Sequence, residues 1–364
     1  MDRVTVEVYE GNARRYHERR AVQREERVRA FADAVDGRRL DLGAGPGIYL
    51  PLLGRPAIAL DAAASMLVEA RLNAPDTPVV RADLLHLPFR RGAFAGVWAS
   101  KAHQHVLAEQ LPMAFADVHH ALALNGRFEL TMFAGDGTEI TPPEDDLPGR
   151  RFTWWQPEAL TLALVGAGFV VESIEPVGEG RNPRIEATAT RVRTLPDYVD
   201  GGMRLLCCGL NPSLHAADSG IGYVTPGNRF WPALRDAGLT ELDRDPRRLL
   251  THDHIGMTDV VKRATARAAD LTTAEYRVGV ERLSRLCAWL RPQAICFVGL
   301  AGWRAAIDRK AMVGGQPGEL GGVPVYVMPS TSGLNARVPR DELAAHLRAA
   351  AEGPSGAAAV PTGH

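Results

Sequence analysis

Two junctions, at which an apolar strand runs into a glycine-containing loop, constrain the fold of this chain more than any other feature. The first spans residues 38–47 (RRLDLGAGPG) and the second spans residues 203–213 (MRLLCCGLNPS). After each junction, apolar runs of strand length alternate with longer helical segments. Such alternation is typical of parallel strands joined by crossover helices. It predicts two α/β domains, each a doubly wound, three-layer, mostly parallel sheet.

The length of 364 residues accommodates both domains. Charged amphipathic helices are expected up to about residue 34. The stretch TLPDYVDGGM interrupts the alternation with Pro, Asp and paired Gly, which are typical of a linker. We therefore predict a first domain over 1–193, a linker over 194–203, a second domain over 204–351 and a disordered tail over 352–364.

Charge is distributed unevenly between these segments. Residues 204–351 hold 19 Lys+Arg and 14 Asp+Glu, a net +5, whereas the whole chain is at −1. This asymmetry favours a polyanion as partner of the second domain. All four cysteines stand in apolar runs, and no apolar stretch reaches the length of a membrane span. We expect a monomeric cytoplasmic, nucleoid-associated protein with reduced cysteines and no membrane partner.

The first glycine loop has the composition of a nucleotide-cofactor site. Its run is Asp41-Leu42-Gly43-Ala44-Gly45-Pro46-Gly47, and these glycines permit positive φ and close approach of a ligand. Asp61 ends the next strand, where a carboxylate can accept both ribose hydroxyls. Asp83 closes the third strand, where an acid can reach an adenine amine.

Residues 5–193 resemble the class I S-adenosylmethionine-dependent methyltransferases. The matching segments are DLGAGPG, LDAAASML, RADLLHLPF, AGVWASKAHQHV and TWWQPEALTLALVGAGFVVESIE. The resemblance implies S-adenosylmethionine as cofactor, held by Asp41, Gly43, Gly45, Gly47, Asp61 and Asp83. A NAD-binding fold is the competing interpretation, but the third glycine follows the second after two residues and not three.

The methyl acceptor is not identified by the sequence. His103 and His105 follow the fourth strand, where the family places residues that face the substrate. The Asn/Asp-Pro-Pro-Tyr/Phe motif of DNA amino-methyltransferases is missing there, which argues against methylation of base amino groups. A domain that binds the cofactor without turnover is left open.

The second glycine loop resembles that of the mismatch-specific uracil/thymine DNA glycosylases, within the uracil-DNA glycosylase superfamily. The run Gly209-Leu210-Asn211-Pro212-Ser213, a tyrosine twelve residues after its asparagine, and PGNRFW stand in family order. HIGMTDVVKRATARAADLT and MPSTSGLNARVPR complete the match over about residues 203–350.

The resemblance and the residue chemistry together assign roles in this second domain. The Asn211 amide oxygen can orient a water toward the anomeric carbon of the nucleotide, and Tyr223 offers an aromatic face to a flipped pyrimidine. Gly209 and Leu210 are expected to contribute backbone to the base pocket. Asn228 is expected either to contact the base or, as we favour, to hold the pocket backbone.

A loop after the last strand supplies a candidate wedge. Leu334 can fill the gap left by an extruded base, between Ser332 and Gly333 on one side and Asn335 on the other. Some members of the family carry arginine where Leu334 stands. Arg337 is expected to meet phosphate.

The sequence therefore predicts a monofunctional glycosylase for uracil, thymine or ethenocytosine opposite guanine in double-stranded DNA, fused to a methyltransferase of unknown acceptor. No cofactor or metal is expected in the glycosylase domain, and Lys262 is the only lysine near enough for lyase chemistry. Two alternatives stay open. One is a protein that binds mismatches or damage without excision, and the other is a methyltransferase directed to nucleic acid by the glycosylase fold.

Overall fold

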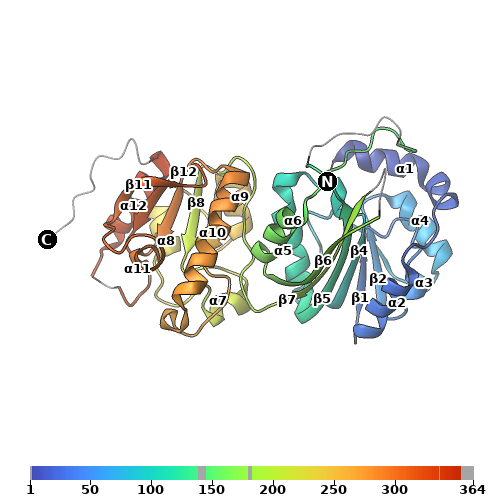
Figure 1. The fold of residues 1–364 in the computed structure, drawn as a ribbon, viewed down its shortest axis with the longest axis horizontal. Coiled ribbons are helices and arrows are strands. Elements are labelled where there is room, and N and C mark those ends of the chain that lie inside the picture. The colour runs from blue at the N-terminus through green and yellow to red at the C-terminus, as the bar shows by residue number, and fades with distance from the viewer. Residues whose placement is uncertain (1, 138–144, 179–182, 336, 354–364) are drawn as a thin grey trace. The chain divides into compact units, whose positions relative to one another are not determined.

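The computed structural model describes residues 2–137, 145–178, 183–335 and 337–353. It separates into unit 1, Met1–Val192, and unit 2, Arg193–His364 (Figure 1). Each unit contains its own sheet with flanking helices, which confirms the predicted α/β class. The predicted tail from residue 354 onward lies outside the described residues. Among the described residues, no helix is both long enough and apolar enough to cross a membrane.

The sheet of unit 1 is mixed. Its order is β3-β2-β1-β4-β5-β7-β6, with β1 to β5 parallel and β7 antiparallel to both its neighbours. The strands are β1 (Arg39–Leu42), β2 (Ala57–Asp61), β3 (Val79–Arg81), β4 (Phe94–Ser100), β5 (Leu122–Phe133), β6 (Phe169–Val177) and β7 (Arg184–Arg191). Because β1, β2 and β3 are parallel neighbours, their carboxyl ends meet at one edge of the sheet.

Helices cover both faces of this sheet. They are α1 (Arg3–Glu18), α2 (Glu25–Ala34), α3 (Leu50–Leu53), α4 (Ala64–Asn73), α5 (Leu111–Ala121) and α6 (Pro157–Gly166). Figure 1 shows α5 and α6 on one side and α2, α3 and α4 on the other. The helices expected before residue 34 are confirmed as α1 and α2. Two short 3-10 turns, η1 (His103–His105) and η2 (Ala108–Gln110), occupy the stretch between β4 and α5.

Unit 2 has a five-stranded sheet of order β11-β12-β10-β8-β9. All pairs are parallel except β11 with β12. The strands are β8 (Leu205–Gly209), β9 (Ile255–Asp259), β10 (Ile295–Val298), β11 (Gly314–Leu320) and β12 (Val323–Met328). Every residue of β8, β9 and β10 is buried. The strands β8 and β10 are central and parallel, as expected for strands covered on both faces, whereas β9 is at the edge of the sheet and pairs there with Tyr198.

The helices of unit 2 are α7 (Leu214–Ser219), α8 (Phe230–Asp236), α9 (Pro246–Asp253), α10 (Thr273–Leu290), α11 (Leu300–Ala306) and α12 (Arg340–Glu352), with a 3-10 turn, η3 (Ala268–Asp270). One core joins the β8 side chains Leu205 and Cys207 to Trp231 of α8 and Leu347 of α12. Alternation along the strand places Cys208 on the opposite face. The four cysteines are free and buried, as the sequence predicts.

Residues 194–203, expected to be a linker, pack into unit 2. Tyr198 pairs with Met257 of β9 through two backbone hydrogen bonds of 2.9 Å. Asp197 is buried and accepts from Arg282 at 2.6 Å and from Lys262 at 2.7 Å. The Pro, Asp and Gly content is thus explained by a tight packed turn, in which the aspartate completes an ion-pair network.

Candidate functional site

The glycine loop after β1 is built for close backbone approach. Gly43, Gly45 and Gly47 have φ of 69°, 54° and 73°. A Cβ on Gly43 would lie 2.4 Å from the Cβ of Ala102, whereas a Cβ on Gly45 would have only Tyr16 near it, at 4.0 Å. Gly43 is therefore fixed by packing, and the backbone at Gly45 is open to a ligand.

Three carboxylates stand at the carboxyl ends of β1, β2 and β3 or just beyond them. The Asp61 carboxylate accepts from the N–H of Gly45 at 2.8 Å and from the N–H of Ala63 at 2.9 Å, and burial raises its pKa. Asp41 is buried, its Oδ2 has no partner among the described residues, and burial raises its pKa to about 8. Asp83 follows β3 and accepts from the N–H of Leu85 at 2.9 Å.

These groups fit S-adenosylmethionine. The cofactor combines a ribose diol with a cationic sulfonium and ammonium, and each carboxylate oxygen here retains lone pairs for them. The orphaned Asp41 Oδ2 is a buried acceptor that a cation would satisfy. Asp61 also orients the loop, because both its oxygens hold backbone N–H groups.

His103 and His105 are both buried, within the 3-10 turn η1. The His103 ring lies edge-on to Phe115 and Phe128, and burial lowers its pKa to about 3. His105 contacts the Tyr9 hydroxyl at 2.9 Å and the Arg151 carbonyl at 2.7 Å. The acceptor site expected at these histidines therefore stays a prediction, and neither ring is exposed.

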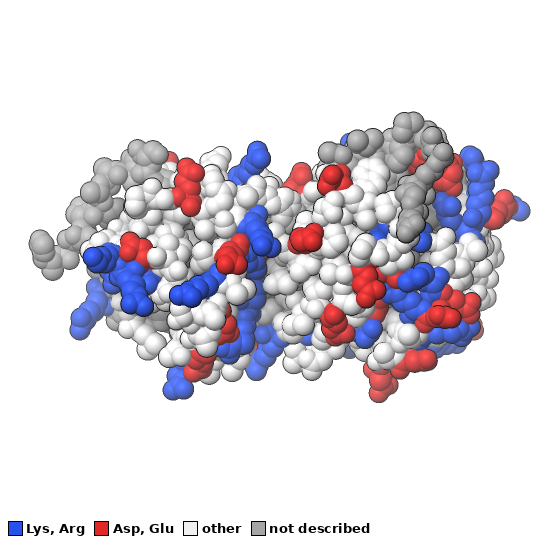
Figure 2. All heavy atoms as spheres, viewed as in Figure 1, with Lys and Arg blue, Asp and Glu red and all other residues white. Residues whose placement is uncertain are grey.

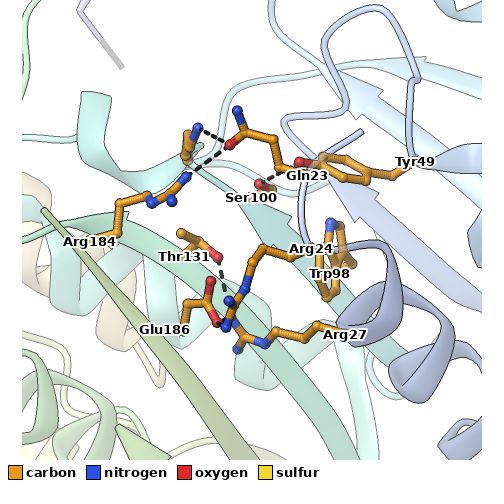
Figure 3. A pocket seen from close by; sticks show the side chains of 10 residues that line it. Gln23, Arg24, Arg27, Tyr49, Trp98, Ser100, Thr131, Arg184 and Glu186 are labelled. Atoms are coloured by element: carbon orange, nitrogen blue, oxygen red, sulfur yellow. Dashed lines mark hydrogen bonds and ion pairs between the residues drawn. The ribbon is translucent and has the colours of Figure 1, made fainter. Parts of the chain in front are cut away.

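A pocket lies at the carboxyl ends of β4 and β5 (Figure 3). Ten residues line it: Gln23, Arg24, Arg27, Tyr49, Trp98, Ser100, Lys101, Thr131, Arg184 and Glu186. They come from the α1–α2 connection, α2, the segment before α3, and β4, β5 and β7. No spacing in the sequence brings these residues together, so sequence reasoning missed them.

Asn211 stands two residues beyond β8 in unit 2, and its amide is fixed by the loop after β9. Its Nδ2 donates to the Thr265 hydroxyl at 2.8 Å, to the Arg263 carbonyl at 3.0 Å and to the Pro212 carbonyl at 3.2 Å. The Thr265 hydroxyl itself donates to the Arg267 carbonyl at 2.9 Å. The NH₂ group therefore points into the loop, and within the described part of the chain Oδ1 accepts no hydrogen bond.

Tyr223 and Asn228 lie in the loop before α8. The Tyr223 ring stacks on Phe230 with centroids 4.0 Å apart, and its φ is 56°. Its hydroxyl is buried with no partner among the described residues. Asn228 Oδ1 accepts from the N–H of Phe230 at 3.0 Å, at the start of α8. This contact is of the kind that the predicted backbone-holding role of Asn228 requires, and the role itself stays a prediction.

Gly209, the last residue of β8, leaves space for two polar groups at the end of that strand. A Cβ there would lie 2.4 Å from Asp259 Oδ1 and 3.0 Å from the Tyr223 hydroxyl. Burial raises the pKa of Asp259 to about 6, and Asp197 adds to the shift while Lys262 and Arg282 oppose it. Asp259, which stands in the run TDVVK, was not predicted from the sequence as a site residue. The Leu210 side chain lies against Gly302 of α11, where a Cβ would be 2.4 Å from its Cδ1.

The candidate wedge loop is hydrogen-bonded at its base and exposed at its tip. Asn335 Nδ2 donates to the Ser330 carbonyl at 3.0 Å, and the N–H of Leu334 donates to Ser332 Oγ at 3.3 Å. A Cβ on Gly333 would lie 3.0 Å from the Gly227 carbonyl. The Leu334 side chain is 99% exposed, and Arg337 is exposed as well. An exposed apolar tip on a hydrogen-bonded loop is what the predicted wedge requires.

Charges of both signs are interspersed on the face of each unit shown in Figure 2. The net positive charge of 204–351 therefore produces no unbroken basic surface in that view. Within the described residues, the interior cations of unit 2 near β9 are engaged: Lys262 and Arg282 both bind Asp197.

Comparison with known proteins agrees with this division. Residues 196–351 match the model of the uracil DNA glycosylase superfamily, and residues 40–130 match that of a methyltransferase domain. A methyltransferase structure from Mesorhizobium loti is 23% identical over 46% of this chain and 96% of its own, with a TM-score of 0.38. One from Methanosarcina mazei is 14% identical over 43% of this chain and 93% of its own, with a TM-score of 0.39. The Burkholderia thailandensis 1,6-didemethyltoxoflavin N1-methyltransferase is 18% identical over 51% of this chain and 85% of its own, with a TM-score of 0.42.

Proposed function

The chain contains a uracil DNA glycosylase superfamily domain and a methyltransferase domain, and we propose that the first excises uracil or thymine mispaired with guanine in double-stranded DNA. The observation that supports this most is the orientation of Asn211. Its NH₂ group is held by three acceptors, so its amide oxygen is left to receive a hydrogen bond from water.

In the proposed reaction, this water attacks the anomeric carbon of a flipped nucleotide while the bond from that carbon to the base breaks. The base leaves with the bonding electron pair, the water oxygen stays on the sugar, and the water proton passes to the base. Because the sugar becomes oxocarbenium-like, a well-placed neutral water suffices. A neutral amide is a weak base, so the chemistry is expected to be slow.

Base recognition follows from the groups around Gly209. One face of the Tyr223 ring stacks on Phe230, and the other face can stack on a pyrimidine. The Tyr223 hydroxyl, which has no partner among the described residues, and the Asp259 carboxyl both lie beside Gly209. Leu334 is suited to replace the extruded base in the duplex. Lys262 is bound to Asp197, which favours water over a lysine nucleophile and a monofunctional enzyme.

Single-turnover excision on duplexes that carry G·U, G·T, G·ethenocytosine and A·U tests this proposal. Abasic sites in the G·U duplex but not the A·U duplex, lost in Asn211→Ala, are the expected result. Asn12→Ala is the matched control, because the Asn12 amide caps only a carbonyl within α1 of unit 1. Binding of all guanine mismatches without excision would instead favour a damage-binding protein.

We further propose that unit 1 is an S-adenosylmethionine-dependent methyltransferase. Asp41, Gly45, Asp61 and Asp83 would hold the cofactor, which supplies a methyl group that passes to a nucleophile of the acceptor as a proton is released. Calorimetric titration with S-adenosylhomocysteine tests the site, with Asp61→Ala expected to abolish binding. Asp76→Ala is the control, because Asp76 is exposed on the surface and, among the described residues, is paired with Arg55.

A further inference from the structure

The pocket of unit 1 contains two pairs of cations in different electrostatic situations (Figure 3). Arg24 and Arg27 are neutralised. Arg24 binds Glu186 at 2.8 Å, and Arg27 binds Glu186 at 3.1 Å and also contacts the buried Glu129. These two arginines therefore serve the structure of the pocket wall.

Lys101 and Arg184 have no carboxylate partner among the described residues. The Lys101 Nζ donates to Gln23 Oε1 at 3.1 Å, and Arg184 donates to the same oxygen at 2.9 Å. Two cations thus converge on a single neutral amide oxygen. Charge-assisted hydrogen bonds to an ionised acceptor are about twice as strong as those to a neutral one. An anionic oxygen at this point would be bound in preference to the amide.

Other features of the pocket fit this deficit of negative charge. The buried Arg184 Nε and the Trp98 Nε1 are donors without partners in the described part of the chain. Burial, together with repulsion from Arg184 and Arg20, lowers the pKa of Lys101 to about 8. The backbone of Lys101 is left-handed, with φ of 60°, and is held by a 2.8 Å hydrogen bond to the Thr131 carbonyl. A strained, fixed lysine is typical of a functional position.

The pocket adjoins the proposed cofactor loop. Trp98 of β4 is the register partner of Asp41 in β1, and Tyr49 follows that loop directly. Tyr49 and Trp98 lie edge to face with centroids 5.6 Å apart, which supplies an aromatic wall. Glu186 Oε1 has no partner among the described residues, so the pocket can also accept an N–H or O–H of a ligand.

We propose that this pocket binds the methyl acceptor, and that the acceptor carries a carboxylate or phosphate held between Lys101 and Arg184. The proposal rests on the methyltransferase function of unit 1. Gln23 lies in the connection between α1 and α2 and occupies the anion position when no acceptor is bound. The acceptor displaces this side chain.

The test uses calorimetry on the full chain saturated with S-adenosylhomocysteine. The probes are two matched pairs, benzoate with benzamide and phenyl phosphate with phenol. In at least one pair the anion should bind about tenfold more tightly than its neutral partner. The pair that shows this preference identifies the anionic group of the acceptor as a carboxylate or as a phosphate. Lys101→Met and Arg184→Gln should each reduce the preference to about threefold or less, because each variant removes one charged contact to the anion.

Gln23→Glu is a variant that does not depend on removing a cation. Its carboxylate would pair with Lys101 and Arg184 within the chain, so anion binding should be lost while the thermal midpoint rises. Arg29→Gln is the control, since Arg29 is exposed and paired with Glu25 of its own helix. It should bind the probes as the wild type does.

Failure of the inference is separable from failure of the methyltransferase proposal. A chain that does not bind S-adenosylhomocysteine contradicts the cofactor site, and with it the inference. A chain that binds S-adenosylhomocysteine but binds neither anion at millimolar concentration, or binds each neutral partner equally well, overturns the inference alone. A preference that persists in both cation variants overturns it too.

Discussion

Gly209 and Asp259 are register partners at the ends of adjacent parallel strands, and a Cβ on Gly209 would lie 2.4 Å from Asp259 Oδ1. The absence of a side chain at residue 209 thus leaves room for the carboxyl of Asp259 and the hydroxyl of Tyr223 at the end of β8. These two polar groups can lie so close to the backbone of β8 because residue 209 is a glycine.

Gly209→Ala is therefore expected to disrupt the placement of these two polar groups. The added methyl would displace Asp259 and Tyr223, and overpacking of this kind costs about 1–3 kcal/mol. Single-turnover excision should fall and the thermal midpoint of unit 2 should drop. Gly318→Ala is the control, because a Cβ there meets nothing within 4 Å. Equal behaviour of the two variants would show that residue 209 does not shape the site.

Asp259 should make the stability of unit 2 depend on pH. Burial raises its pKa from 3.8 to about 6, so between these values the folded chain keeps a proton that the unfolded chain has lost. The free energy of unfolding consequently decreases as the pH rises through this window. Asp259→Asn stays neutral, so its stability relative to wild type should increase across the window by at most about 3 kcal/mol.

Hydrogen exchange of the peptides that cover β8 and β9, followed by mass spectrometry, measures this effect locally. The protection of the variant relative to wild type should increase from pH about 4 to pH about 7 and then level off. A difference that is constant over this range would mean that Asp259 does not retain its proton on folding.

Asn211→Asp is expected to slow excision and not to accelerate it. Aspartate is the stronger base, but it has no N–H to donate to Arg263 O and Thr265 Oγ1, and its oxygen would face the Arg263 carbonyl. Each lost hydrogen bond costs about 1 kcal/mol, so the side chain at position 211 should no longer orient the water. The rate of excision should therefore fall by more than about tenfold. A rate above wild type in the same single-turnover assay would contradict this account of Asn211.

The local part of the fold could be predicted from the sequence. The junction at 38–47 and the run at 203–213 combine apolar residues with glycine, and both strands end where the glycines begin. The order of the strands could not be predicted. The last strand of unit 1 in the sequence, β7, lies between β5 and β6 and is antiparallel to both, which no local run of residues indicates.

Long-range partners explain most of the remaining differences. Asp197 was assigned to a linker because its neighbours are typical of turns, yet its partner Arg282 lies 85 residues away. Lys101 and Gln23 are likewise 78 residues apart, and their shared environment arises only when the α1–α2 connection covers the ends of β4 and β5. His103 and His105 have the polarity of site residues, but both are buried within a short 3-10 turn.

Leu334 provides a test that separates DNA contact from folding. Its side chain is 99% exposed, so Leu334→Ala should change the free energy of unfolding by no more than about 0.5 kcal/mol. If the leucine fills the space of the extruded base, the same change should weaken binding to a G·U duplex by about tenfold, since unstacking is then uncompensated. Fluorescence anisotropy with labelled duplex measures this, and Leu72→Ala is the matched control because Leu72 is a 70% exposed leucine of unit 1. Equal affinity in the two variants would assign the wedge to another residue, whereas loss confined to Leu334→Ala would tie the bare tip of this loop to base extrusion.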